Sequence, residues 1–277
     1  MRLGGPIFED YADPASWAKA VRSADYRAAH CPVGPDADAD EIDACAEAAR
    51  KADIVIAEVG AWSNPLSPDE SERKEALRKC KDSLHLADQI GAQCCVNIAG
   101  SRGEIWHGPC PQDLTEETFQ MIVETVRDII DSVKPSRSCY ALETMPRMYP
   151  DSADSYLRLM RAIDREGFGV HFDPVNLIRS PQHYFHNDDV IRECFDKLGP
   201  HMLSCHAKDI LLHDTLTVHL DEVRPGTGHL DYGTFFREAS KLSPDLPLMM
   251  EHLPSAEEYN LAAGYLRSVA QEEGVGL

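Results

Sequence analysis

The chain has 277 residues and 43% of them are hydrophobic, so it can bury the core of one large α/β domain. Its formal net charge of −20 comes from 47 acidic and 27 basic side chains, and such a surface repels nucleic-acid phosphates and anionic lipid. No apolar run approaches the roughly 20 residues that a membrane helix needs. We therefore expect no nucleic-acid partner and no membrane partner.

The cysteine pattern indicates a reducing environment. There are nine cysteines, and none forms a C-x-x-C pair, which argues against zinc-knuckle and thioredoxin-like sites. No basic segment followed by an apolar stretch, the pattern of a signal peptide, begins the chain. We expect a cytoplasmic protein whose thiols are free and pack as small core residues.

Short apolar runs alternate with amphipathic stretches along the chain. The runs predict eight strands, at Arg2–Gly4, Tyr26–His30, Ile54–Glu58, Cys94–Ile98, Cys139–Glu143, Gly169–Asp173, Met202–His206 and Leu248–Glu251. Helices are predicted in the gaps, at 38–51, 70–90, 152–165 and 187–198, and in two further stretches of helical period. The first of these two follows an N-cap at Thr115, and the second follows a capping box formed by Ser255 and Glu258.

Strict alternation of strands and helices predicts parallel strands joined by crossover helices. Eight such units in residues 1–277 favour one domain, a single closed (β/α)8 TIM barrel. The alternative is an open doubly wound sheet, which usually carries a glycine-rich phosphate loop after its first strand; Gly4-Gly5-Pro6 does not match that loop. The segments 63–69 and 207–229 are expected to be irregular and to lie over the mouth of the barrel.

Four consecutive predicted strands each end at a potential metal ligand. These ligands are Glu143, Asp173, His206 and Glu251. One such residue alone is ordinarily a helix cap, a salt-bridge partner or a packed histidine, but strands five to eight of a barrel are neighbours at its rim. The set therefore predicts one cation site, and oxygen ligands with one imidazole favour Mn²⁺, with Mg²⁺ or Co²⁺ as alternatives and Zn²⁺ less favoured.

Three local motifs accompany these ligands: FDPVNL at 172–177, CHAKD at 205–209 and RPGTGHLDY at 224–232. With the ligand order, they resemble the xylose-isomerase-like TIM barrel superfamily over nearly the whole chain. That superfamily contains sugar and sugar-phosphate isomerases and 3-epimerases, inosose and dehydroshikimate dehydratases, and metal-dependent apurinic endonucleases. The resemblance implies that Glu143 and Glu251 are metal ligands and also the catalytic acid/base pair.

The resemblance implies a metal-dependent isomerase or epimerase that moves a proton through a metal-stabilised enediolate of a sugar, a sugar phosphate or a keto-sugar. The first alternative is a dehydratase, a lyase acting on an inosose-like or dehydroshikimate-like ketone. Less favoured are a non-catalytic sugar-binding barrel and an abasic-site endonuclease. Asn176 stands where many members have a histidine that helps to bind additional zinc, which favours a single metal and argues against DNA repair. A homo-oligomer is consistent with the family.

Further residues are predicted to contact the substrate. They are Asn176, Lys208, Arg224, Glu58, Asn64, His107 and Trp62. Arg224 is similar in place to an arginine of the ketose 3-epimerases, and Lys208 directly follows the ligand motif, where it would orient the metal site or contact the substrate. Trp62, together with Trp106, would form an apolar wall against a sugar face. His171 is expected to face the barrel interior.

Overall fold

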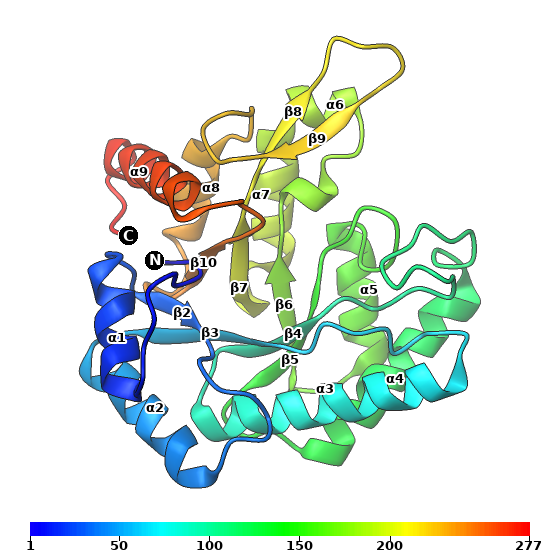
Figure 1. The fold of residues 1–277 in the computed structure, drawn as a ribbon. Helices are drawn as coiled ribbons and strands as arrows, with labels where there is room; N and C mark the ends of the chain where they lie inside the picture. The colour runs from blue at the N-terminus through cyan, green and yellow to red at the C-terminus, as the bar shows by residue number, and fades with distance from the viewer.

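The computed structural model describes all residues from Met1 to Leu277. Eight parallel strands close into a barrel in the order β1-β10-β7-β6-β5-β4-β3-β2, with helices outside it (Figure 1). The strands are β1 (Arg2–Gly4), β2 (Ala28–His30), β3 (Val55–Gly60), β4 (Cys94–Asn97), β5 (Cys139–Glu143), β6 (Phe168–Phe172), β7 (Met202–Ala207) and β10 (Pro247–Met250). The predicted (β/α)8 barrel and its eight strands are confirmed.

Nine α-helices follow the strands. They are α1 (Pro14–Ser23), α2 (Ala39–Lys51), α3 (Glu70–Ile90), α4 (Glu116–Val133), α5 (Ala153–Ile163), α6 (Pro181–Phe185), α7 (Asn187–Leu198), α8 (Tyr232–Ala239) and α9 (Ala256–Glu272). Most begin behind an Asp, Ser or Thr whose side chain accepts a backbone N–H of the first turn, which satisfies an otherwise unpaired donor. None is long and apolar enough to cross a membrane.

The two predicted N-caps are present, but the predicted capping box is not. Thr115 Oγ1 accepts the Thr118 N–H at 3.3 Å, and Ser255 Oγ accepts the Glu258 N–H at 3.3 Å. The Glu258 carboxylate does not reach back to the cap. It accepts a hydrogen bond from Arg224 Nε at 2.8 Å instead, because an arginine brought close by the fold is the stronger partner.

The main core lies between the barrel and its helices and contains 62 buried residues. The predicted apolar face of α4 belongs to it: Phe119, Ile122, Val126 and Ile129 are all buried. Since the helices pack on the outside of the strands, the carboxyl ends of the strands are left to carry the polar side chains of a site.

The segment 207–229, predicted to be irregular, contains a two-stranded antiparallel hairpin formed by β8 (Asp209–Leu212) and β9 (Leu220–Val223). It projects beyond β7 at the top of Figure 1. The prediction was wrong because two four-residue strands separated by a polar loop give a weak apolar signal, and pairing across the hairpin stabilises them. The hairpin forms one wall at the end of the barrel where the predicted ligands lie.

Asp209 anchors the base of this hairpin. Its carboxylate accepts four backbone N–H groups, from Ile210 at 2.8 Å, Gly226 at 2.9 Å, Gly228 at 3.0 Å and Leu230 at 2.8 Å. A Cβ atom on Gly228 would lie 2.4 Å from Asp209 Oδ1, so only glycine fits this close approach. The RPGTGHLDY motif is therefore, in part, the loop that folds around one carboxylate.

Candidate metal centre

The four predicted ligands converge at one end of the barrel. Their strands β5, β6, β7 and β10 are consecutive neighbours in the sheet. His206 Nδ1 lies 3.2 Å from Glu143 Oε1 and 2.8 Å from Glu251 Oε1. One ligand atom from each of Glu143, Asp173, His206 and Glu251 lies within 4.8 Å of the other three. The structure thus brings together the residues that the sequence placed at four separate strand ends.

The chemistry of this group fits a divalent cation. Three carboxylates and one imidazole face one another, and Glu143, Asp173 and His206 are buried. Burial, with the nearby charges of Glu143 and Glu251, raises the pKa of Asp173 to about 6, although Lys208 opposes the shift. Carboxylates crowded in this way call for positive charge among them, and oxygen ligands with one imidazole suit a hard or borderline cation.

Lys208 supplies part of that charge. Its ammonium lies 2.7 Å from Asp173 Oδ2, 2.5 Å from Glu251 Oε1, 3.7 Å from Glu143 Oε1 and 3.6 Å from Glu222 Oε2. Burial lowers the pKa of this group, but the surrounding carboxylates outweigh that effect and raise the pKa of Lys208, so it stays charged. Four carboxylates against this ammonium and the imidazole of His206 leave a negative excess that a divalent cation would offset.

Asn176 orients two of the ligands. The short 3-10 turn at Val175–Leu177 begins two residues after Asp173 and carries the Asn176 side chain back over the site. Asn176 Nδ2 donates to Glu143 Oε1 at 3.1 Å and to Asp173 Oδ2 at 3.0 Å. Thr144, which the sequence did not single out, fixes the Asp173 backbone through hydrogen bonds of 2.8 and 2.9 Å. An amide donor at Asn176 thus holds two of the candidate carboxylate ligands in place.

A cavity of about 510 Å³ opens onto the ligands. Of the predicted substrate contacts, Trp62, His107, Asn176 and Lys208 line it, as does Trp106. Five further lining residues were not predicted from the sequence: Ile98, Met145, Arg147, Glu222 and His252. They lie in loops and in the hairpin, where no polar strand-end signal marks them.

Three predicted substrate contacts lie elsewhere. Glu58 is 2% exposed and lies inside the barrel, behind His206. The Asn64 side chain is buried and bonded to the backbone of Ser101, which ties two loops together. Arg224 pairs with Glu258 outside the cavity. These placements correct the prediction, because proximity to a strand end does not determine whether a side chain points to the mouth, to the interior or to a neighbouring helix.

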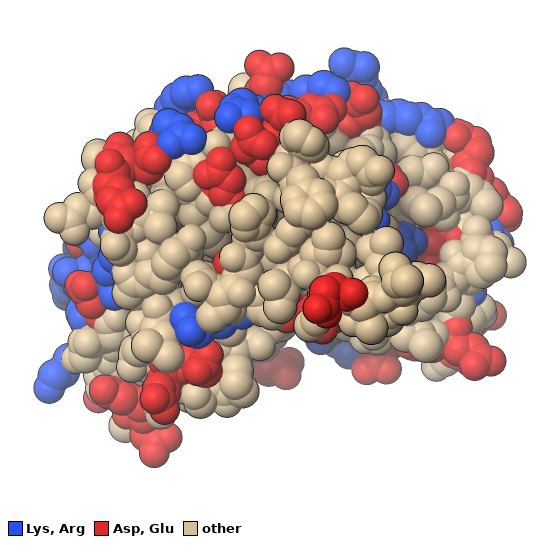
Figure 2. All heavy atoms as spheres, turned by 90° about the horizontal axis from the view of Figure 1, so that it is seen from above, with Lys and Arg blue, Asp and Glu red and all other residues tan.

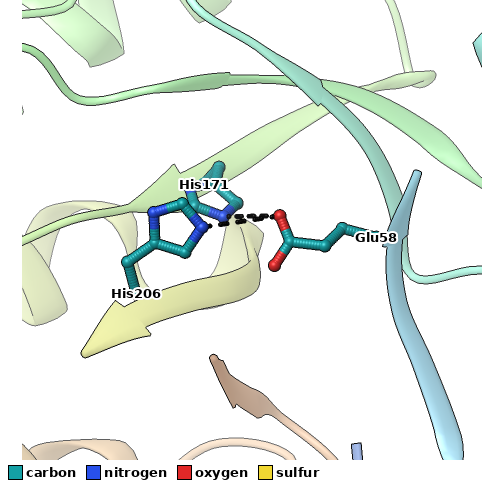
Figure 3. Close-up of side chains that lie close together, drawn as sticks. All are labelled: Glu58, His171 and His206. Carbon is teal, nitrogen blue, oxygen red and sulfur yellow. Dashed lines mark ion pairs between the residues drawn. The ribbon is translucent and has the colours of Figure 1, made fainter. Parts of the chain in front are cut away.

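Behind the ligands lies a second buried group, formed by Glu58, His171 and His206 (Figure 3). Glu58 Oε2 is 3.2 Å from His171 Nε2 and 3.6 Å from His206 Nε2. His171 is fully buried and faces the barrel interior, as predicted. His206 therefore belongs to both groups, with one ring nitrogen toward each.

Comparison with known proteins gives the family. The family model for xylose isomerase-like TIM barrels matches residues 18–269. A search of curated proteins returned no significant match.

Solved structures share the fold. A xylose isomerase-like TIM barrel protein from Mycobacterium smegmatis, in complex with magnesium, superposes with a TM-score of 0.66 at 17% identity, covering 95% of this chain and 89% of that one. D-psicose 3-epimerase from Clostridium cellulolyticum H10, with D-tagatose, gives 0.65 at 15% identity and covers 99% and 96%. The probable 3-DHS dehydratase AsbF from Bacillus anthracis gives 0.69 at 14% identity and covers 97% and 98%. With the family model matched over most of its length, this chain belongs to the xylose isomerase-like TIM barrel family.

Proposed function

We propose that this protein is a divalent-metal-dependent isomerase or epimerase of a sugar, a sugar phosphate or a keto-sugar. The observation that carries the proposal is the pair Glu143 and Glu251, each with an oxygen within 3.2 Å of His206 Nδ1, facing a cavity of about 510 Å³. Structural neighbours include proteins described as D-psicose 3-epimerase and L-ribulose 3-epimerase. That likeness supports sugar chemistry in this barrel.

Glu143, Asp173, His206 and Glu251 would hold the cation. When bound, it would act as a Lewis acid that acidifies the C–H bond beside a carbonyl group. We propose Mn²⁺, with Mg²⁺, Co²⁺ and Zn²⁺ as the alternatives to be compared, since the ligand set is mainly oxygen. The neighbour solved in complex with magnesium supports a hard divalent cation in a barrel of this kind.

The proton transfers fall to the two glutamates. A carboxylate can remove a proton from carbon when it lies within hydrogen-bond reach, and its conjugate acid can return one. Glu143 and Glu251 come from β5 and the end of β10, on either side of His206, so they can approach one carbon from two directions. Removal by one and return by the other inverts the carbon, whereas return to the adjacent carbon interconverts aldose and ketose.

The cavity walls combine aromatic surface with polar side chains, a combination that suits a sugar. Trp62 and Trp106 contribute aromatic surface, which packs against sugar faces. Arg147 lines the same cavity. Among the 18 arginines, Arg147 and Arg161 are the two whose side chains form no ion pair and donate no hydrogen bond within the protein. We propose that Arg147, with His107, contacts the end of the substrate remote from the cation.

Dehydration is the second candidate reaction, and the place of Lys208 favours it. Its ammonium is 2.5 Å from Glu251 Oε1, so a base stands beside a fixed positive charge. Glu251 could remove a proton from one carbon and return it to the hydroxyl that leaves the next carbon as water, while the ammonium stabilises the negative charge that develops in between. The structural similarity to the probable 3-DHS dehydratase also supports dehydration as a candidate reaction.

The surface charge and the cysteines bear on the class of substrate and on the cellular compartment of the protein. Figure 2 views the molecule from the end where β8 and β9 project and shows acidic and basic side chains gathered mainly toward the edge. The overall charge of −20 supports a small-molecule substrate rather than nucleic acid. The nine free cysteines support a cytoplasmic location.

We also propose that the protein forms a homo-oligomer, which analytical ultracentrifugation would test.

The test is a reaction of the metal-loaded protein with a panel of ketoses, ketose phosphates and keto-sugars in D₂O, followed by NMR. Isomerisation and epimerisation introduce deuterium and retain every hydroxyl, whereas dehydration removes one. Glu143→Gln and Glu251→Gln should each slow exchange by about 10²–10⁴-fold. Glu124→Gln, on the exposed face of α4, is the matched control and should leave exchange unchanged. Equal exchange in all four proteins would refute the acid/base assignment.

A further inference from the structure

Glu58 is a buried carboxylate with no lysine or arginine partner. Its side chain is 1% exposed, and its only ion-pair partners are His171 and His206. Ser204 Oγ adds a weak hydrogen bond to Glu58 Oε1 at 3.4 Å. An isolated buried carboxylate is costly, and Glu58 Oε2 accepts no hydrogen bond, so the two nearby imidazoles are the groups that can stabilise its charge.

His206 divides its two ring nitrogens between two groups of carboxylates. Nδ1 faces Glu143 and Glu251 at the candidate cation site, at 3.2 and 2.8 Å. Nε2 faces Glu58 Oε2 at 3.6 Å, from the opposite side of the ring. A neutral imidazole carries one proton, so the nitrogen that keeps it cannot ligate a cation.

We infer that Glu58 is a positioning residue that selects the tautomer of His206. A negative charge beside Nε2 favours a proton there, and a cation held by Glu143 and Glu251 would displace any proton from Nδ1 and take its lone pair. Glu58 lies on β3, across the barrel from β7, and does not line the cavity, so it reaches the cation site only through His206 (Figure 3). The inference rests on the proposed cation site and names what fixes its one nitrogen ligand.

His171 holds Glu58 in place. Its Nε2 lies 3.2 Å from Glu58 Oε2, and its ring meets that of His206 nearly edge-on, with centroids 4.1 Å apart and planes at 75°. The two rings thus approach one carboxylate oxygen from neighbouring strands β6 and β7. This packing leaves His206 little freedom to rotate away from the orientation that presents Nδ1.

The alternative role for these residues is to bind a second cation through Glu58, His171 and His206 Nε2. The two roles predict different numbers of bound cations per chain. Tautomer selection requires one cation per chain in the wild type and in a Glu58 variant, whereas a second site requires two in the wild type and one in the variant.

The experiment measures cation binding without turnover. Metal-free full-length protein is titrated with Mn²⁺ by calorimetry, and the ¹⁵N-histidine protein loaded with Zn²⁺ is examined by long-range ¹H–¹⁵N NMR. Glu58→Gln keeps the side-chain volume but removes the charge and should weaken Mn²⁺ binding about 10- to 100-fold. In the wild type, the His206 proton should reside on Nε2; in Glu58→Gln that preference should be lost.

Ser204→Ala is the matched control, because it removes the other contact of Glu58 and leaves His206 untouched. It should bind Mn²⁺ as the wild type does, and circular dichroism with thermal melting checks that each variant is folded. Unchanged affinity and an unchanged His206 tautomer in Glu58→Gln would overturn the inference, as would two cations per wild-type chain. If the wild type binds no divalent cation, the cation site of the proposed function fails, and the inference fails with it.

Discussion

Lys208 Nζ lies 2.7 Å from Asp173 Oδ2, and both side chains are buried. The two residues are 35 positions apart in the sequence and meet because β6 and β7 are neighbours in the closed barrel. The ammonium also reaches Glu251 and Glu143, so one lysine is shared by three candidate ligands. The positive charge of Lys208 and that of the proposed cation would therefore act on the same carboxylates.

Replacing Lys208 by methionine should destabilise the metal-free protein. Removing one partner of a buried ion pair costs about 3–5 kcal/mol, because the other charge is left without compensation. A divalent cation should restore much of this loss, so Mn²⁺ should raise the Tm of Lys208→Met more than that of the wild type. Calorimetry with and without Mn²⁺ checks both effects. An equal Tm in the two metal-free proteins would show that the lysine does not support the cluster.

Replacing Arg147 by methionine should weaken substrate binding and leave the chemistry intact. Loss of a hydrogen bond to a charged group costs about 1.5–3 kcal/mol, so KM should rise about 10- to 100-fold with little change in kcat. Arg161→Met is the matched control, since Arg161 is likewise unpaired but is an exposed residue of α5. Steady-state kinetics with the ketose that the wild type converts measures kcat and KM for both variants. A fall in kcat with constant KM would place Arg147 in the chemical step instead.

Replacing Gly228 by alanine should loosen the hairpin base. The new Cβ would lie 2.4 Å from both Asp209 Oδ1 and Ile210 O, so the loop must shift and lose hydrogen bonds, at a cost of about 1–3 kcal/mol. Gly264→Ala on α9, where a Cβ meets nothing within 4 Å, should instead add about 0.5–1 kcal/mol of stability. Denaturant unfolding measures both variants. Equal midpoints for the two would contradict the role given to Asp209.

Asp88 links the end of α3 to the loop before β5 and makes stability depend on pH. Its Oδ1 accepts the N–H groups of Ser136, Arg137 and Ser138 at 2.7, 2.6 and 3.0 Å. Burial raises the pKa of Asp88, but these hydrogen bonds outweigh it, and the pKa is lowered from 3.8. The stabilisation is therefore present above about pH 4 and is lost as the pH falls through the lowered value.

Asp88→Ala should lose about 1 kcal/mol at pH 7, a modest figure because the carboxylate is largely solvated. Below pH 3 the difference from the wild type should shrink. Chemical unfolding at several pH values makes the comparison, with Asp82→Ala on the same helix as control. A difference that stays constant from pH 7 to pH 3 would show that ionisation of Asp88 is not involved.

The sequence was sufficient for the strand order and for grouping the four candidate ligands. Buried parallel strands appear as continuous apolar runs, and their polar ends must meet at one rim once the barrel closes, so Glu143, Asp173, His206 and Glu251 could be placed together from spacing alone. The N-caps at Thr115 and Ser255 were predictable for a different reason. Each cap depends only on residues close to it in the chain.

Only the tertiary structure decided which way the remaining polar side chains point. Glu58 also ends a predicted strand, yet the closed barrel directs it inward to His171 and His206 rather than to the cavity. Arg224 forms an ion pair with Glu258, 34 residues away in the sequence. The segment 207–229 contains a hairpin because its two short strands pair with each other. The period of the apolar residues and the spacing of caps and turns report local conformation. The partner of a charged side chain depends instead on which distant segments the closed barrel brings beside it.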